Sequence, residues 1–359
     1  MSQVRAALWG QCVTWPVEQT DALLRLNAQQ GTGALVYPSA LAQADLSSYA
    51  RAQMKGVCVR TMQQQTQLQH TLMLAWQALE KAGIHAVLLK GAGLAALYAD
   101  PSQREWGDID LFVGKDQYHP ACAVMRETFP NALTFDEELE HYKHYNLIAD
   151  GISIELHRVS VSLQHPLDER RYARMEAQGM ADAESMVIDG LQVRVPEPTF
   201  NVLFVFMHAW EHMLTKGAAV RQLCDLALLL RHYKDRIDAP RLKRSLCALH
   251  LMEVWQLYAY ILVHELGLER SEALWYSETV ADRAEALLTD LLAKAEKADP
   301  QIEITSVPNR FVRKFHTMQT RLAEARRIKR YSTQYARHMT ATTITHGAQR
   351  LFAKDRKWE

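Results

Sequence analysis

The sequence LLKGAGLAALYADPSQREWGDIDLFV, residues 88–113, decides the fold. One apolar run ends at a Lys-Gly pair, a short helix-forming stretch ends before Pro101, and the next apolar run carries Asp108 and Asp110 around a single isoleucine. Alternate side chains of a strand point to the same face, so we expect the two aspartates to face one side of a sheet. Neighbouring carboxylates repel each other unless a cation lies between them. The stretch therefore predicts strand, turn, helix and strand, with a cation at the second strand.

The Lys90-Gly91 pair suits a phosphate group. A glycine between a strand and a helix allows the backbone to approach a phosphate, and the helix start presents N–H groups to it. Lys90 would add a point charge. A D-x-D pair alone is common at solvated strand ends, and Lys-Gly alone is a common turn. Their combination in this order favours a site for a metal and a phosphate.

A third carboxylate is available in GISIELHRV, where Glu155 lies between Ile154 and Leu156. The alternating pattern predicts that Glu155 shares a face with Ser153 and His157, while the apolar residues point to the other side. Carboxylate oxygens are the ligands that magnesium prefers, and three of them can hold a metal pair.

The remaining pattern predicts an α+β chain. Apolar residues at helical spacing occupy residues 18–82, and two hairpins are predicted with Asp150-Gly151 and Asp189-Gly190 as their turns. Pro120 is expected to limit the start of the helix that follows the Asp108 strand. Helices are predicted at Thr199–Leu214, Ala219–Tyr233, Pro240–Leu266, Ser277–Lys297 and Arg310–Met339. The predicted domains are an N-terminal helical segment (1–82), a core with a small mixed sheet (83–196) and a C-terminal helical domain (197–359).

Composition restricts the class of protein. Of 359 residues, 48% are hydrophobic and 23% charged, which indicates a globular core. The five cysteines are scattered, no secretory leader is indicated and no apolar run could span a bilayer, so a cytoplasmic protein without membrane contact is expected. The 41 basic and 41 acidic residues balance, but residues 310–359 hold 13 Lys or Arg against 3 Asp or Glu. That basic end could bind nucleic acid or another acidic partner, or could be the solvated face of an amphipathic helix.

These motifs resemble the nucleotidyltransferase superfamily with the DNA polymerase β fold, in which a glycine turn opens a helix and an h-D-h-D-h strand follows. More narrowly, LLKG, the small-residue helix, Arg104, DIDLFV and IELHRV resemble the bacterial group of uncharacterised nucleotidyltransferases. The resemblance extends over about residues 15–235. Two positions depart from the pattern: Arg158 replaces a usual Trp, and Lys-Gly replaces the superfamily's commoner Gly-Gly or Gly-Ser.

The resemblance implies a metal-dependent transfer of a nucleoside monophosphate from a nucleoside triphosphate, with ATP expected, to an acceptor hydroxyl, releasing pyrophosphate. Mg²⁺ or Mn²⁺ would be held by three carboxylates that are also the catalytic residues: Asp108, Asp110 and Glu155. Nucleotide contacts are expected from a larger set: Lys90, Gly91, Arg104, His157, His208, Arg221 and Asp225. For Arg104 an ion pair that holds the loop is an equal alternative, and for Asp225 a structural pair with Arg221. The acceptor could be a small molecule, a peptide or protein, or an RNA.

Three other functions stay open at this point. One is a toxin-type or antitoxin-type transferase that acts on tRNA or protein, and another is a catalytically inactive nucleotide-binding module. The third is a zinc protease, because HAWEH places His208 and His212 one helical turn apart with Glu211 between them. The protease needs a further ligand that the sequence does not single out.

Overall fold

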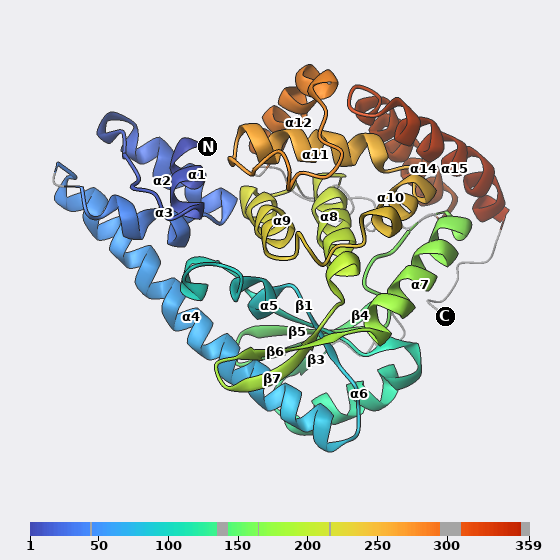
Figure 1. The fold of residues 1–359 in the computed structure, drawn as a ribbon. Coiled ribbons are helices and arrows are strands. Elements are labelled where there is room, and N and C mark those ends of the chain that lie inside the picture. The colour runs from blue at the N-terminus through green and yellow to red at the C-terminus, as the bar shows by residue number, and fades with distance from the viewer. Residues whose placement is uncertain (44, 135–142, 164, 215–216, 295–309, 353–359) are drawn as a thin grey trace. The chain divides into compact units, whose positions relative to one another are not determined.

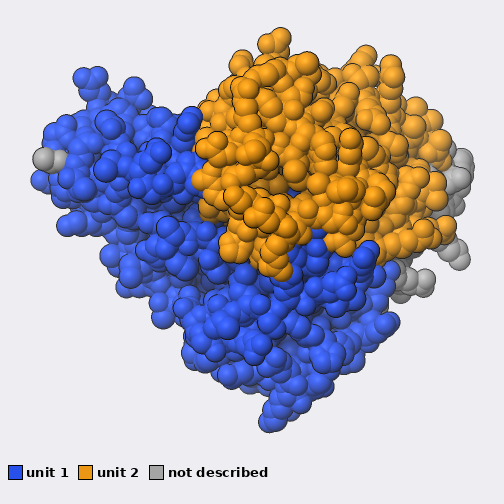
Figure 2. Space-filling view, in the orientation of Figure 1, with its two compact units in different colours: residues 1–162, 176–204, 358–359 blue, residues 163–175, 205–357 orange. Residues whose placement is uncertain are grey.

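The computed structural model describes residues 1–43, 45–134, 143–163, 165–214, 217–294 and 310–352 (Figure 1). The chain forms two compact units, coloured separately in Figure 2. The first unit comprises Met1–Ser162 and Glu176–Phe204, and the second comprises Leu163–Met175 and Val205–Lys357. Each unit is described by itself below. The predicted domain boundaries at 82 and 196 remain predictions.

The first unit begins with helices, as the sequence predicts for residues 18–82. The long helix among them starts at the Ser47 cap, whose hydroxyl accepts a hydrogen bond from the Ala50 N–H, and stops before Gly83 with its left-handed φ of 72°. The helices are α1 (Ser2–Leu8), α2 (Thr20–Gln30), α3 (Gly33–Ala40) and α4 (Ser48–Lys81).

A five-stranded mixed sheet follows, in the order β1-β2-β5-β4-β3. Its strands are β1 (Val87–Leu89), β2 (Asp108–Phe112), β3 (Leu133–Thr134), β4 (His144–Ala149) and β5 (Ile152–His157). The β2–β5 pair is parallel and the other neighbours are antiparallel. The fold is therefore α+β, mostly helical with a mixed sheet, as predicted.

The two faces of this sheet differ in polarity. One face carries a buried apolar set that packs with α4 and with α6 (Gly114–Thr128): Ile109, Leu111, Tyr145, Leu147, Ile154 and Leu156. The opposite face carries Asp108 and Asp110 of β2 beside Ser153, Glu155 and His157 of β5. The alternation predicted for β2 and β5 is thus present, and the core that fixes the register also fixes the polar face.

Two hairpins form with the predicted turns. Asp150 and Gly151 join β4 to β5, and Asp189 and Gly190 join β6 (Glu184–Ile188) to β7 (Leu191–Val195) in a separate two-stranded sheet. All four turn residues have positive φ, between 47° and 80°, as a two-residue type I′ turn requires.

Helix α6 corrects one expectation. It starts at Gly114 and continues through Pro120, which therefore lies inside the helix and does not set its start. Gly114, with φ of 70°, ends β2 and turns the chain into the helix, and the apolar face of α6 (Tyr118, Ala121, Cys122 and Met125) holds it on the sheet. Tertiary packing here outweighs the hydrogen bond that proline removes.

The second unit is helical, as predicted. It contains the first part of α7 (Pro166–Ala181) and all or most of α8 (Pro198–Leu214), α9 (Val220–His232), α10 (Ala239–Ala248), α11 (Met252–His264), α12 (Ala281–Lys294), α14 (Arg310–Ile328) and α15 (Thr333–Phe352). Part of the helix predicted at Ser277–Lys297 lies outside the described residues. Within the described ranges, no helix combines the length and apolarity needed to cross a bilayer.

Two helices predicted as continuous are each divided. The helix predicted at Pro240–Leu266 is α10 and α11, separated at His250, whose φ of 60° reverses the chain. The helix predicted at Arg310–Met339 is α14 and α15, with a break between Ile328 and Thr333. In both places apolar spacing continues across the break, so hydrophobic periodicity alone did not reveal it.

Candidate active site

The parallel pair β2–β5 brings the predicted carboxylates to one place. Asp110 lies directly opposite Glu155, and Asp108 lies opposite Ser153. Asp110 is fully buried, whereas the side chain of Glu155 is 24% exposed and Asp108 is half-buried. The three carboxylates therefore line one polar face, with Asp110 innermost.

Lys90 supplies a cation to this face. It follows β1 and has φ of 52°, uncommon for a residue with a side chain, and its ammonium lies 3.0 Å from Asp110 Oδ2. Burial would lower the pKa of Lys90, but the charges of Asp110, Asp108 and Glu155 outweigh it and raise that pKa. The lysine predicted to contact phosphate thus also neutralises the carboxylate group.

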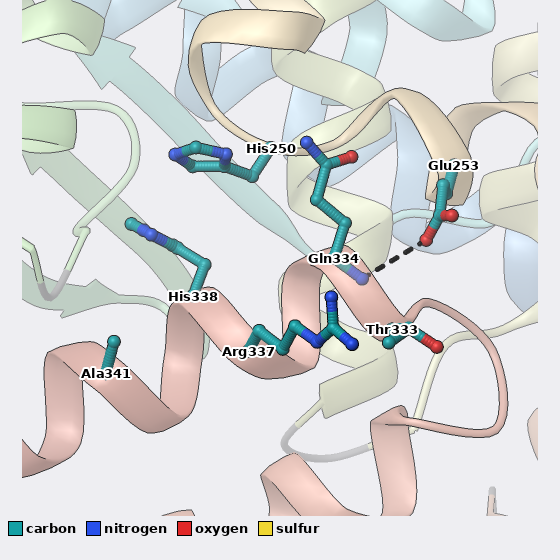
Figure 3. A pocket seen from close by; sticks show the side chains of 7 residues that line it. All are labelled: His250, Glu253, Thr333, Gln334, Arg337, His338 and Ala341. Carbon is teal, nitrogen blue, oxygen red and sulfur yellow. Dashed lines mark hydrogen bonds between the residues drawn. The ribbon is translucent and has the colours of Figure 1, made fainter.

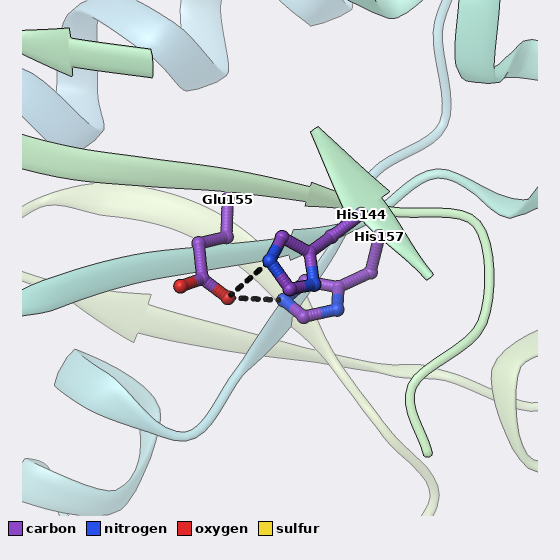
Figure 4. Close-up of side chains that lie close together, drawn as sticks. All are labelled: His144, Glu155 and His157. Atoms are coloured by element: carbon purple, nitrogen blue, oxygen red, sulfur yellow. Dashed lines mark ion pairs between the residues drawn. The ribbon is translucent and has the colours of Figure 1, made fainter. Parts of the chain in front are cut away.

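His157 lies between Asp110 and Glu155 and contacts both. Its Nε2 lies 2.9 Å from Asp110 Oδ1 and 3.3 Å from Glu155 Oε2. His144 lies beside His157, with ring centroids 5.2 Å apart, and its Nε2 is 3.9 Å from the same Oε2. Figure 4 shows both imidazoles directed at this oxygen. One carboxylate oxygen and two imidazole nitrogens thus meet within 4.8 Å of one another.

The ionisation of these groups follows from their contacts. Burial would raise the pKa of Asp110, but Lys90 and then the hydrogen bond and charge of His157 lower it well below its usual range. Burial likewise opposes the charged form of His157, yet the hydrogen bonds that its imidazole makes to Asp110 and Glu155, and the charges of both acids, raise its pKa. For Glu155, burial and the charge of Asp110 raise the pKa, but the hydrogen bond and charge of His157 together with the charge of His144 lower it overall. The contacts among Lys90, Asp110, Glu155 and His157 thus favour the charged form of each of these four groups.

The Lys90-Gly91 turn is held in place by a buried arginine. Arg104 is buried, and its Nη1 donates to the Gly91 carbonyl at 3.1 Å, while Gln65 Nε2 donates to the Arg104 carbonyl at 2.6 Å. A Cβ on Gly91, which has φ of 40°, would lie 3.2 Å from the Trp106 ring. Arg104 thus positions the turn, and a direct contact between Arg104 and nucleotide remains a prediction.

His144 was not predicted from the sequence, although the signal was present. A two-residue turn at Asp150-Gly151 pairs Ala149 with Ile152, and counting back along the two strands pairs His144 with His157. Counting the hairpin register would have placed His144 on the polar face.

Arg158, which stands where the resembling group usually has Trp, points away from the site. Its guanidinium lies 3.8 Å from the centroid of the Tyr118 ring, on α6. A planar guanidinium stacks on an aromatic ring much as an indole would, so the replacement preserves packing next to His157.

The remaining predicted residues belong to the second unit. His208 and His212 lie on α8 with ring centroids 4.4 Å apart, while Arg221 and the buried Asp225 lie on α9. Their roles in nucleotide binding stay predictions. Among the described residues, the groups of three side chains that could share one ion do not include His208 or His212, and the zinc-protease alternative stays untested.

The donor set on the polar face fits a hard divalent cation. Asp108, Asp110 and Glu155 offer oxygen ligands, and all three already act on one cationic group, Lys90. Asp110 is engaged by Lys90 and His157, so an incoming ion would compete with them for its oxygens. The half-buried Asp108 and Glu155 are the more accessible ligands.

The similarity of the chain to known proteins points to one family. Residues 16–267 match the model of a family described as uncharacterised nucleotidyltransferase. No curated protein matches the chain. One solved structure is similar, an antigenic nucleotidyltransferase-like protein from Paracoccidioides brasiliensis. It has 15% identity and a TM-score of 0.34, over 51% of this chain and 86% of that one.

Proposed function

Because the chain belongs to the uncharacterised nucleotidyltransferase family, we propose that it transfers a nucleoside monophosphate from a nucleoside triphosphate to an acceptor hydroxyl. Asp108, Asp110 and Glu155 would be the catalytic carboxylates and would hold Mg²⁺ or Mn²⁺. ATP is the triphosphate we expect. The proposal rests above all on the opposition of Asp110 and Glu155 across a parallel strand pair, on the face away from the core.

In the proposed reaction the acceptor oxygen forms a bond to the α-phosphorus, and the bond from that phosphorus to the bridging oxygen breaks. Pyrophosphate leaves, and the hydroxyl proton passes to a carboxylate of the site. The bound metal supplies charge neutralisation for the phosphates. The chain's own residues orient the triphosphate: the Lys90-Gly91 turn, fixed by Arg104, offers a positive charge and a close backbone approach.

The geometry limits which carboxylate can take the proton. Both oxygens of Asp110 are occupied, one by Lys90 and one by His157, and the side chain is fully buried. Asp108 and Glu155 are partly exposed and can reach an acceptor. Asp110 is therefore assigned to holding charge, and the proton to Asp108 or Glu155.

One observation favours a second candidate, an inactive nucleotide-binding module. The Lys90 ammonium lies where the carboxylates converge, and a lysine that stays there would keep a metal out. Binding of triphosphate without transfer, in the presence of Mg²⁺ or Mn²⁺, would identify this case.

The test is incubation of the full chain with each α-labelled nucleoside triphosphate, Mg²⁺ and cell extract. Wild type should label an acceptor, and the Asp108→Asn variant should not, whereas Asp116→Asn, an exposed aspartate on α6, should behave as wild type. Absence of any labelled product with all four triphosphates would contradict the proposal.

The same experiment identifies the acceptor class. Label lost on RNase treatment would indicate RNA, which would also support the toxin-type transferase and a role for the basic α14 and α15 in binding nucleic acid. Label lost on protease treatment would indicate a peptide or protein. Label that resists both would indicate a small molecule.

A further inference from the structure

A second group of metal-ligating side chains lies in the second unit, separate from the carboxylates of the sheet. His165 precedes α7, Asp168 lies in the first turn of α7, and His338 lies on α15. One ligand atom from each lies within 4.8 Å of the other two. A fourth residue, His250, stacks on His338 with ring centroids 4.1 Å apart. Three imidazoles and one carboxylate thus converge from three parts of the chain.

The distances suit a shared ion. Asp168 Oδ2 lies 2.5 Å from His338 Nε2 and 3.9 Å from His165 Nδ1. Ligands bound to one zinc ion at about 2.0–2.2 Å lie roughly 3 Å from each other. The two observed separations lie on either side of that value, so small side-chain rotations would bring the three atoms to coordination distance.

A supporting contact holds the carboxylate in place. Asp168 is buried, and its second oxygen, Oδ1, accepts a hydrogen bond from Arg171 Nη1 at 3.1 Å. Arg171 also donates to the Ala248 carbonyl at 3.0 Å, two residues before His250. An outer hydrogen bond of this kind fixes the orientation of a metal-binding carboxylate and leaves Oδ2 directed at the imidazoles.

The group opens onto a pocket of about 550 Å³. Figure 3 shows the side chains that line it: His250, Glu253, Thr333, Gln334, Arg337, His338 and Ala341. His250 and His338 therefore belong to both the pocket wall and the histidine group. An ion held there would have protein ligands on one side and accessible space on the other, which leaves coordination positions for water or a small ligand.

A single hydrogen bond between Asp168 and His338 does not explain why two further imidazoles lie beside this pair. Asp168 needs one imidazole to satisfy Oδ2, yet a second imidazole approaches the same oxygen and a third lies against the first. Two nitrogens and one carboxylate oxygen form the ligand set that proteins use for zinc and for related transition metals.

We propose that His165, Asp168 and His338 bind a divalent transition-metal ion, with His250 as a further ligand or neighbour, at the wall of this pocket. Imidazole nitrogens select Zn²⁺ and its neighbours over Mg²⁺. The site is independent of the proposed nucleotidyl transfer, so each can fail without the other.

The test is calorimetric titration of the full chain with Zn²⁺ in excess Mg²⁺. Wild type should bind one equivalent that His338→Asn and His165→Asn each weaken by more than about 100-fold, since outer contacts alone are worth about 10- to 100-fold. Two controls should retain that equivalent. His264→Asn removes an exposed histidine 3.6 Å from Glu278, and His144→Asn alters the histidine group of the sheet.

Spectra of the Co²⁺-loaded wild type provide a second readout, which reports the coordination of the ion directly. Visible bands typical of low-coordinate cobalt with nitrogen and oxygen ligands are expected, and they should disappear in His165→Asn and in His338→Asn, whose side chains are each about one-fifth exposed. Equal Zn²⁺ affinity in wild type, His165→Asn and His338→Asn would overturn the proposal. Loss of the equivalent in His144→Asn alone would assign the zinc to the sheet and overturn it equally.

Discussion

Lys90 and Asp110 form a buried ion pair, with 3.0 Å between the ammonium nitrogen and Oδ2, in the middle of the carboxylates that the sequence assigns to a metal. Asp108 and Glu155 add their charges to the same lysine. Without a divalent ion, Lys90 is thus the cation that allows three acids to share one face of the sheet.

Replacing this lysine should destabilise the chain in the absence of metal. In Lys90→Met, Asp110 would stay buried, and His157 would be its remaining ion-pair partner among the described residues. Breaking a buried ion pair costs about 3 kcal/mol in free energy of unfolding. Urea unfolding in EDTA measures this cost, with Lys115→Met, an exposed lysine on α6, as the control. Mn²⁺ should then raise the melting temperature of Lys90→Met more than that of wild type. Equal stability of wild type and Lys90→Met would show that the ion pair is unimportant.

His157 should make stability depend on pH. Because the folded pKa of His157 is raised above 6.5, its contribution is fully present below the unfolded pKa and is lost as pH rises through the folded value. The lowered pKa of Asp110 leaves that residue charged throughout this range. The free energy of unfolding of wild type should therefore exceed that of His157→Gln by more at pH 6 than at pH 9, in EDTA.

A double-mutant cycle identifies the partner that causes this dependence. In an Asp110→Asn background, the effect of His157→Gln on stability should lose most of its variation with pH, since the main hydrogen bond to the charged imidazole is then missing. A difference between wild type and His157→Gln that stays constant from pH 6 to pH 9 would contradict the assignment of a charged His157.

Glu155 should matter more for the chemical step than for binding. Glu155→Gln leaves Asp108, Asp110 and Lys90 in place for the triphosphate but removes one charged ligand near the acceptor. Single-turnover rate should fall at least 100-fold while triphosphate affinity changes little, and Glu127→Gln, exposed on α6, should match wild type. If Glu155→Gln has a normal rate per folded molecule and only its melting temperature falls, Glu155 is a structural partner of His144 and His157 and not a catalytic residue.

Gly91 should tolerate no side chain. Gly91→Ala combines a left-handed φ of 40° with a contact at 3.2 Å from the Trp106 ring, whereas Gly83→Ala has φ of 72° in open space. The control should lose roughly 1 kcal/mol from backbone strain alone, and Gly91→Ala should lose clearly more and also bind triphosphate more weakly. Thermal unfolding of both variants measures the difference, and equal losses would mean that Trp106 does not restrict the turn.

Much of the fold could be predicted because local signals agreed with the tertiary structure. Asp150-Gly151 predicts a hairpin, and the alternation around Asp108 and Glu155 predicts a sheet with one apolar and one polar face. The break at His250 could not be predicted, because the apolar spacing continues across it and no glycine or proline marks the turn. The start of α6 was wrong for the opposite reason: Pro120 is a strong local signal, and packing of the helix on the sheet overrides it.

The sequence predicted which residues of each strand belong to the site, but it did not predict how the strands pair. The opposition of Asp110 and Glu155 follows from strand order, which one sequence does not determine, and the pairing of Lys90 with Asp110 depends on the conformation of one turn. Counting the register of the Asp150-Gly151 hairpin would have predicted His144. The group of His165, Asp168 and His338 could not be predicted, since those residues are far apart in the chain and carry no motif.

If the carboxylates of β2 bind the metal that nucleotidyl transfer requires, the transfer rate must depend on Mg²⁺ through Asp108. Single-turnover transfer from an α-labelled triphosphate would be followed over a range of Mg²⁺ concentrations for wild type, Asp108→Asn and Asp116→Asn, each normalised to folded protein. We predict saturable Mg²⁺ dependence for wild type and Asp116→Asn, and a rate reduced by at least about 1,000-fold at every concentration for Asp108→Asn, because at least ~4 kcal/mol of transition-state stabilisation is lost. Equal rates and equal Mg²⁺ dependence in Asp108→Asn and Asp116→Asn would show that Asp108 does not bind a metal that the transfer requires.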